Sequence, residues 1–196
     1  MFIQIKNLTK KFKNNLAVNN INFSIEKNNV LGLLGPNGCG KTTSIGMMLG
    51  LIKPTSGQII IDNKNLESFK RNDILARINF ASPYIELPKK LTVRQNLEVY
   101  GRLYGIKNRK ERIEEISEDL DIKDFFDRQT GELSSGQKNR VSLAKSLINK
   151  PEILLLDEPT ASLDPDIGDF VRTYIQSYSS KNKVTILLAS PQYGRG

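Results

Sequence analysis

The sequence predicts an α/β fold with a mostly parallel sheet, an N-terminal antiparallel β portion and an inserted helical subdomain. Short apolar runs at 30–34, 153–156 and 184–189 are typical of buried parallel strands. Helical patterns lie between these runs, and strands that alternate with helices favour a parallel sheet. Residues 21–25 instead alternate apolar and polar side chains, as in a strand with one face toward water.

The N-terminal elements follow from local pattern. Residues 2–5 predict a first strand, and the polar, lysine- and asparagine-rich segment 9–20 is expected to be a turn or strand edge. After the apolar run that stops at Gly35, residues 42–51 predict a helix. Isoleucines at 59–61 then predict a strand that opens at a Ser-Gly pair.

The middle of the chain changes to helical spacing. Apolar residues recur among charges over 93–104 and again over 109–120, which predicts two helices of an insertion. A third helix is predicted over 136–149, where Pro151 stops it. A last helix is predicted over 169–179, before the final apolar run.

Length and composition indicate one domain. The chain has 196 residues, of which 38% are hydrophobic and 26% charged, which excludes disordered and collagen-like classes. One cysteine excludes an internal disulfide framework and favours a reducing compartment. No apolar run approaches the ~18 residues of a membrane span. We therefore expect a single domain over 1–196, with a core at 1–83 and 148–196 and a helical subdomain at 84–147.

A phosphate-binding motif stands at 35–42. It reads Gly-Pro-Asn-Gly-Cys-Gly-Lys-Thr, matches G-x-x-x-x-G-K-[ST], and joins a predicted strand to a predicted helix. Glycines let backbone N–H groups turn toward phosphates, and the helix N-terminus adds a favourable dipole. Lys41 is placed to reach the terminal phosphates, and the Thr42 hydroxyl to ligate Mg²⁺. The motif predicts a P-loop NTPase core; an ordinary glycine turn before a helix is the alternative.

An acidic pair follows the apolar run at 153–156. Asp157 would emerge at the carboxyl end of a buried strand, where ligands of open α/β sheets bind. Asp157 is expected to hold Mg²⁺, directly or through water, and Glu158 to polarise an attacking water. A solvated acidic turn is the alternative, which the phosphate-binding motif makes weaker.

A further motif, Leu133-Ser134-Ser135-Gly136-Gln137, directly precedes the helix that leads to the Asp157 strand. The order of phosphate loop, helical insertion, Leu-Ser-x-Gly-Gln and Leu-Leu-Leu-Asp-Glu-Pro-Thr resembles the nucleotide-binding subunit of an ATP-binding cassette (ABC) transporter. The resemblance covers nearly the whole chain. It implies ATP and Mg²⁺ as ligands, hydrolysis that uses Glu158 and Lys41, and a head-to-tail dimer.

The resemblance also assigns roles to other residues. Phe12 matches the aromatic residue that stacks on adenine, although a simple edge-strand hydrophobe is the alternative. The signature residues 133–137 would close over the γ-phosphate of the opposite subunit, with Ser135 in place of the more usual glycine. A loop that touches its twin across the dimer corresponds to Ser162, Leu163 and Asp164. The residues that would surround the triphosphate are Gly35, Asn37, Gly38, Cys39, Gly40, Lys41, Thr42 and Thr43.

Two positions depart from the family pattern. Where the family has a glutamine that ligates Mg²⁺ and senses the transporter, this sequence has Ser82 or Pro83, and Ser82 offers a hydroxyl as a weaker ligand. Where the family has a switch histidine that contacts the γ-phosphate, Pro191 follows Ser190, and the chain contains no histidine. We therefore expect Mg-ATP binding with slow hydrolysis.

The last residues suggest a frameshift. One base inserted after the codon of Ser190 would turn a family-like Ser-His-Asn-Met-Gly-Glu-Val into the observed Ser-Pro-Gln-Tyr-Gly-Arg-Gly, followed by a stop codon. The expectation is a cassette truncated at its C-terminus, and a naturally diverged tail is the alternative.

The function that the resemblance implies is the energy-coupling ATPase of a transporter. A separate transmembrane permease would be its partner, because the sequence has no spanning segment, and the subunit would lie in the cytoplasm on the inner face of the membrane. It would act as a homodimer or as a heterodimer with another ABC ATPase. The alternatives are a remnant that binds ATP without cycling, which Pro191 favours, and a cassette that acts on nucleic acid. The net charge of +8 supports the latter only mildly, and nucleic acid is not the expected partner.

Overall fold

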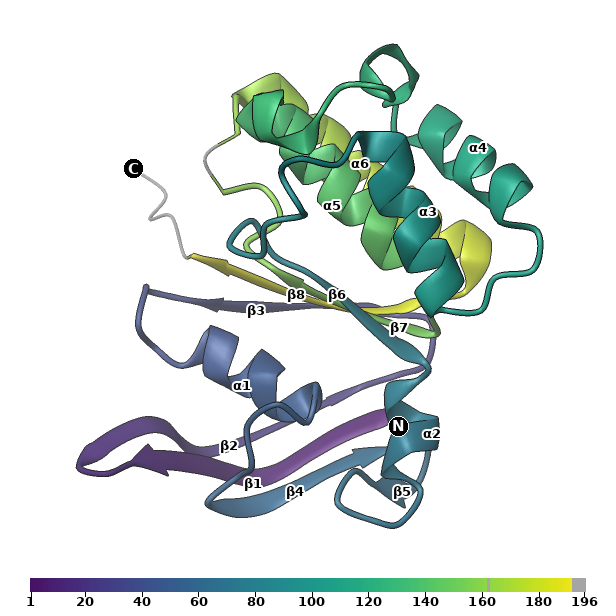
Figure 1. Ribbon diagram of the computed structural model, residues 1–196. Helices are drawn as coiled ribbons and strands as arrows, with labels where there is room; N and C mark the ends of the chain where they lie inside the picture. Colours follow the sequence, from purple (N-terminus) through teal and green to yellow (C-terminus); the bar gives the residue numbers. More distant parts are fainter. Residues whose placement is uncertain (162, 192–196) are drawn as a thin grey trace.

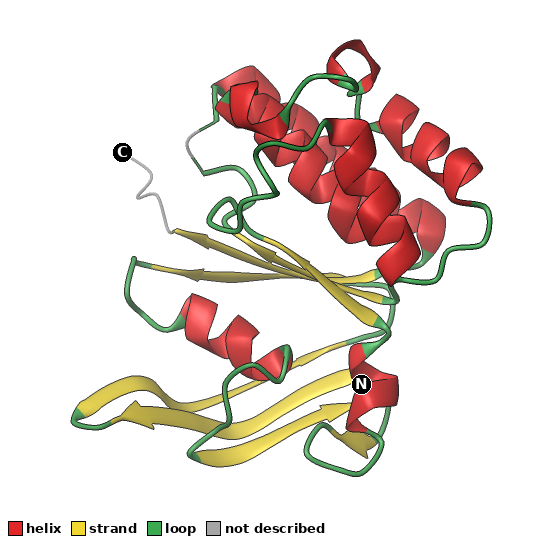
Figure 2. Cartoon of the chain, viewed as in Figure 1, coloured by secondary structure: helices red, strands yellow, loops and turns green. Residues whose placement is uncertain are grey.

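Two sheets and a layer of helices make up the structure, a computed structural model that describes residues 1–161 and 163–191. A four-stranded antiparallel sheet lies at one end, and a four-stranded parallel sheet crosses the middle. One helix lies between the two sheets, and the other long helices cover the opposite face of the parallel sheet (Figures 1 and 2). This arrangement confirms the predicted α/β fold with its antiparallel N-terminal portion.

The antiparallel sheet is built mainly from the N-terminal hairpin. Of the two expectations for 9–20, the turn is wrong for most of its length, because strand pairing runs out to Phe12 and Asn15 and leaves only residues 13–14 in the turn. Residues 15–20 lie in an edge strand of this sheet, in agreement with the strand-edge alternative. Register shifts along the hairpin interrupt the alternation of apolar side chains, so the period of two is lost from the sequence. In the order β2-β1-β4-β5, the strands are β1 (Ile3–Phe12), β2 (Asn15–Ile25), β4 (Ser56–Ile61) and β5 (Lys64–Asn65).

The parallel sheet carries the three predicted apolar runs. All five residues of its strand β7 (Ile153–Asp157) are buried, as predicted. The expectation for β3 (Val30–Gly35) is wrong on one face, because Val30, Gly32 and Leu34 are exposed. Leu31 and Leu33 pack against the core on one face of β3, whereas no residue of β3 belongs to the hydrophobic cluster that the described residues form under the helices on the other face. The order is β3-β8-β7-β6, where β6 is Ile78–Ala81 and β8 is Thr185–Pro191.

The helices occupy the segments in which the apolar spacing is helical. The first begins one residue before its prediction and ends at Met48, because Gly50 turns the chain with a left-handed φ of 66°. The last begins at Pro165, four residues earlier than predicted, with its proline in the first turn. No helix in the described part of the chain combines the length and apolar character needed to cross a membrane. The helices are α1 (Lys41–Met48), α2 (Arg71–Leu75), α3 (Val93–Leu103), α4 (Arg109–Asp119), α5 (Ser135–Leu147) and α6 (Pro165–Asn182).

Strand β7 separates two hydrophobic clusters. Leu154 and Leu156 point toward α3, α4, α5 and α6, while Ile153 and Leu155 point toward α1 and the antiparallel sheet. Each leucine buried in this way stabilises the fold by about 1.5–3 kcal/mol. The strand that ends in Asp157 is therefore packed on both faces.

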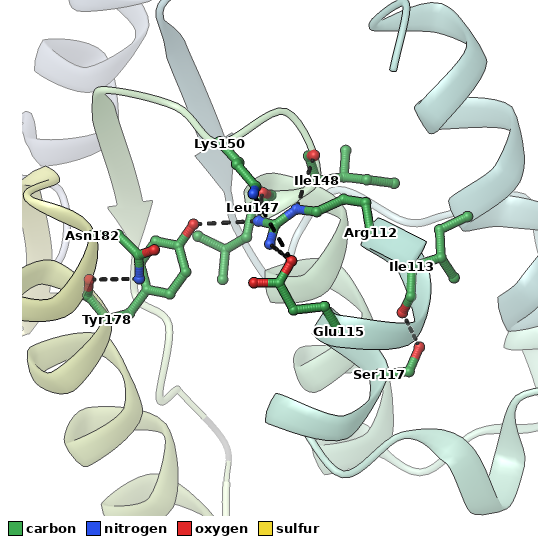
Figure 3. A network of polar contacts seen from close by, with 9 residues as sticks. All are labelled: Arg112, Ile113, Glu115, Ser117, Leu147, Ile148, Lys150, Tyr178 and Asn182. Carbon is green, nitrogen blue, oxygen red and sulfur yellow. Dashed lines mark hydrogen bonds and ion pairs between the residues drawn. The ribbon is translucent and has the colours of Figure 1, made fainter. Parts of the chain in front are cut away.

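A buried arginine joins three helices of the helical layer (Figure 3). Arg112 of α4 is 6% exposed, and its guanidinium donates hydrogen bonds to the carbonyl oxygens of Leu147, at 2.6 Å, and Ile148, at 3.3 Å. It also donates to the hydroxyl of Tyr178 in α6, at 3.4 Å. The hydrogen bond that it donates to Glu115 lowers the pKa of that carboxyl group. Arg112 thus binds carbonyls in the last turn of α5, where the helical hydrogen-bond pattern ends, and Leu147 also accepts from the N–H of Lys150 at 3.1 Å.

Candidate functional site

The loop between β3 and α1 has the backbone shape of a phosphate cradle. Gly38 and Gly40 have φ values of 82° and 92°, which favour glycine. A Cβ on Gly40 would stand 2.2 Å from the carbonyl oxygen of Ala17, because β2 passes directly behind the loop. No side chain of the described residues caps the N-terminus of α1, and its first turn contains no acidic residue. Its terminal N–H groups are therefore available to an anion.

Lys41 is folded back into this loop. Its ammonium group donates to the carbonyl oxygens of Gly35, at 2.6 Å, and Pro36, at 2.9 Å, and the residue is 5% exposed. Neutral carbonyls are weaker acceptors than phosphate oxygens. A phosphate chain in the loop would therefore replace them as partners of Lys41.

The phosphate loop and β7 meet at a hydrogen bond between side chains. Thr42 Oγ1 donates to Asp157 Oδ2 at 2.7 Å, and Asp157 is 1% exposed. Burial raises the pKa of Asp157, although the hydrogen bond from Thr42 opposes this shift. The other oxygen, Asp157 Oδ1, is buried and has no hydrogen-bond partner among the described residues. A buried carboxylate oxygen of this kind, beside a hydroxyl, fits the oxygen ligands that Mg²⁺ prefers.

Glu158 follows Asp157 at the end of the strand. Its backbone is left-handed, with φ 50°, and its N–H donates to the carbonyl oxygen of Ala189 at 2.8 Å. Its carboxylate accepts a hydrogen bond from the hydroxyl of Tyr84, which lies 2.8 Å from Oε2. The contact of Tyr84 was not predicted from the sequence. Tyr84 directly follows Ser82 and Pro83, the positions at which the family glutamine is absent, and this neighbourhood is the sequence feature that could have pointed to it.

Ser82 takes part in its own loop. It is buried, and its Oγ accepts a hydrogen bond from the backbone N–H of Tyr84 at 3.3 Å. The hydroxyl proposed as a weak metal ligand therefore helps to hold the loop after β6.

The signature segment begins α5 with a capping box. Ser134 Oγ accepts from the N–H of Gln137 at 3.3 Å, and Gln137 Oε1 accepts from the N–H of Ser134 at 3.0 Å. Gly136 packs against α6, because a Cβ there would lie 2.7 Å from Ile167 Cδ1. The capping role of Ser134 and Gln137 and the packing role of Gly136 were not predicted, although the spacing S-x-x-Q is typical of the start of a helix.

The other signature residues divide between core and surface. Leu133 is buried in the helical cluster, whereas Ser135 is exposed in the first turn of α5. One turn further, the side-chain amide of Asn139 donates to the carbonyl oxygen of Pro159 at 2.7 Å and so ties α5 to the segment after Glu158. Within the described ranges, no hydrogen bond joins residues 133–137 to the phosphate loop.

The remaining predicted residues are spread around the phosphate loop and α6. Phe12 is 45% exposed, with the ammonium of Lys10 lying 4.8 Å from its ring centroid. Leu163 packs against the helical cluster, and Asp164 precedes α6. Ser162 and the tail 192–196 lie outside the described residues. In the phosphate loop, Asn37 and Cys39 are exposed and Thr43 is half-buried.

Comparisons with known proteins agree with this geometry. The family described as ABC transporter matches residues 18–161. The bacitracin transport ATP-binding protein BcrA of Bacillus licheniformis is 38% identical over 191 residues, which cover 96% of this chain and 61% of BcrA. The zinc import ATP-binding protein ZnuC of Rickettsia conorii is 38% identical over 188 residues, which cover 96% of this chain and 75% of ZnuC. The chain thus spans less than two thirds of the length of BcrA, and it spans three quarters of the length of ZnuC.

Solved structures share the fold. The dimeric, post-hydrolysis ATP-binding cassette MJ0796 with ADP and Pi superposes with a TM-score of 0.85 at 26% identity, covering 96% of this chain and 87% of that one. The structure of cbiO1 from Clostridium perfringens gives a TM-score of 0.83 at 29% identity, covering 97% and 78%. Since a family match spans most of the chain and the phosphate loop, β7 and signature helix stand in one fold, this chain belongs to the ATP-binding cassette (ABC) transporter family.

Proposed function

We propose that this chain binds Mg-ATP and hydrolyses it as the energy-coupling subunit of an ABC transporter. The observation that carries the proposal is the hydrogen bond from Thr42 to Asp157. It joins the phosphate loop to the end of β7, where Glu158 is the next residue. A triphosphate site, a metal site and a carboxylate that can act on water therefore lie side by side.

The phosphates would bind through groups that are already in place. The N–H groups at the start of α1 and the ammonium of Lys41 supply positive charge, and both are directed into the loop. Phe12, on the hairpin that runs behind the loop, would stack on the adenine. Negative charge shifts among the phosphate oxygens during ATP hydrolysis. Contacts that become stronger as this charge develops lower the activation barrier of hydrolysis.

Mg²⁺ would be held by Thr42 and Asp157, whose unpartnered Oδ1 requires a cation or donor. When bound, the ion neutralises charge on the phosphate oxygens. Glu158 accepts a hydrogen bond from a water molecule and so orients that water toward the terminal phosphate. This residue is half-buried, which allows water to reach its carboxylate.

The proposed active unit is a dimer of this chain with an identical or different ABC ATPase. The exposed start of α5, with Ser134 and Ser135, would cover the nucleotide of the partner. The MJ0796 structure, described as dimeric, supports this proposal. The relatives named as transport and import ATP-binding proteins support a transmembrane permease as the second partner, which would place the subunit at the inner face of the membrane.

Mg-ATP is expected to protect Cys39 from alkylation. Cys39 is the only cysteine in the sequence, and it is exposed within the phosphate loop, with its Sγ 3.9 Å from the ammonium of Lys41. At ten times the dissociation constant of ATP, labelling by iodoacetamide should slow about tenfold, because only the free protein reacts. Mass spectrometry of the labelled chain measures the rate. Lys41→Met should remove the protection, whereas equal rates with and without Mg-ATP in the unmodified sequence would contradict binding at this loop.

Pro191→His is expected to raise ATP turnover by about 10-fold or more. Residue 191 pairs with Gly35 in the parallel register of β8 and β3, so a side chain there lies beside the phosphate loop. A histidine would supply the donor that the family pattern has at this position. Steady-state phosphate release measures the effect, and Pro191→Ala controls for removal of the proline ring. An equal rise in both variants, or a rise in neither, would contradict the missing-switch interpretation.

A further inference from the structure

Tyr84 contacts the carboxylate to which the proposed function gives the hydrolytic role. We propose that Tyr84 is a positioning residue, which holds Glu158 in the orientation that hydrolysis requires. This inference rests on the proposed function, because a positioning role has meaning only if Glu158 acts in catalysis. The bond from the Tyr84 hydroxyl to Glu158 Oε2, 2.8 Å long, is the observation that carries it.

Sheet topology brings the two residues together. Strands β6 and β7 are neighbours and parallel, with Ala81 paired to Leu156. Tyr84 lies three residues beyond Ala81, and Glu158 two residues beyond Leu156. The two side chains therefore leave adjacent strands at the same edge of the sheet, although 74 positions separate them in the sequence.

The loop that carries Tyr84 is held locally. Ser82 Oγ accepts the N–H of Tyr84, and the carbonyl oxygen of Ser82 accepts the N–H of Ile85, each at 3.3 Å. Pro83, between them, restricts the backbone φ to one region. The backbone of Tyr84 is thus held by the turn, and formation of the bond to Glu158 fixes the side-chain torsions of a ring that is 69% exposed.

A donor on one oxygen restricts the whole carboxylate. Glu158 has three side-chain torsions, and a half-buried glutamate samples several rotamers unless a partner selects one. A hydrogen bond to a carboxylate is charge-assisted and among the stronger ones in proteins. With Oε2 held by Tyr84, Oε1 can accept from water without the carboxylate first reorienting. In the family pattern, the loop after β6 supplies a glutamine that ligates the metal. In this chain the same loop supplies the hydroxyl of Tyr84, which donates to Glu158.

The test is Tyr84→Phe in the full chain, which removes one oxygen atom and keeps the ring. The turnover number for Mg-ATP should fall about five- to tenfold, while KM for ATP and the protection of Cys39 stay within twofold of the unmodified chain. Tyr174→Phe is the matched control, because its hydroxyl is buried in α6 without a hydrogen-bond partner in the described part of the chain. It should keep the original turnover number.

Glu158→Gln separates the possible outcomes. In the double variant, Tyr84→Phe should cause no further loss beyond that of Glu158→Gln, because both changes act through one carboxylate. If Tyr84→Phe keeps full turnover while Glu158→Gln loses it, the positioning role is overturned and the proposed function stands. The positioning role is also overturned if the two substitutions reduce the turnover number independently, so that their losses multiply in the double variant. A rise in KM for ATP as large as the fall in turnover number in Tyr84→Phe would overturn it as well. If Glu158→Gln leaves turnover unchanged, the proposed function fails and this inference fails with it.

Discussion

Replacement of Glu158 by Gln is expected to reduce ATP turnover about 10²–10⁴-fold while Mg-ATP still binds. The amide has nearly the shape of the carboxylate, but it carries no negative charge and cannot accept the proton of an attacking water. The phosphate contacts of Lys41 and the α1 N-terminus are unchanged by this substitution. Binding and hydrolysis should therefore separate cleanly in this variant.

Phosphate release under steady-state conditions measures the loss, and Cys39 protection shows that the nucleotide is still bound. Light scattering in Mg-ATP adds a second readout, because a variant that binds without hydrolysing should accumulate as the proposed dimer. Glu118→Gln is the matched control, since this glutamate is 63% exposed, pairs with Lys123 and belongs to α4, which lies on the other side of the parallel sheet from α1 (Figure 1). Turnover in Glu158→Gln equal to that of Glu118→Gln would contradict the proposed role of Glu158.

Arg112→Met is expected to lower the free energy of unfolding by about 3 kcal/mol. The methionine keeps most of the aliphatic volume but removes the guanidinium donor from the carbonyl oxygens of Leu147 and Ile148, and Leu147 then keeps only the N–H of Lys150, at 3.1 Å. It also removes a donor to the buried hydroxyl of Tyr178. Buried polar groups that lose their partners each cost about 1–3 kcal/mol, and part of that cost is relieved by local relaxation.

Urea unfolding measured by circular dichroism tests the expectation, with the midpoint shifted and the slope unchanged. Arg172→Met is the control, because Arg172 is 54% exposed and pairs on the surface of α6 with Asp169, which is 72% exposed. That change should cost no more than about 0.5 kcal/mol. Similar losses in the two variants would mean that Arg112 contributes as an ordinary surface residue does.

The parts of the site that are contiguous in sequence were predictable. The phosphate loop and the β7 strand with its acidic pair carry their chemistry in short motifs, and the structure joins them through Thr42 and Asp157. The helices of the insertion were also predictable, since their apolar spacing is local. Of the N-terminal hairpin, only the paired ends at 2–5 and 21–25 were predicted as strands, because register shifts destroy the alternation of the residues between them.

Other features depend on residues that are distant in sequence. The exposed face of β3 follows from its lack of packing against the helical cluster, which no local pattern records. Arg112 looks like one more charge on a polar helix, and only the packing of α5 and α6 buries it. The contact of Tyr84 with Glu158 likewise requires knowledge of which strands are neighbours.

The two hydrophobic clusters around β7 support different parts of the site. Asp157 ends a strand that is clamped on both faces, and Lys41 begins a helix that packs in the cluster beneath it. Tyr84 follows β6, and Ser134 caps α5, one of the helices that cover the other face of the parallel sheet. Close-packed clusters transmit a change in one side chain to its neighbours. A core substitution beneath α1 would therefore disturb the phosphate loop first, whereas one in the helical cluster would disturb the signature helix first.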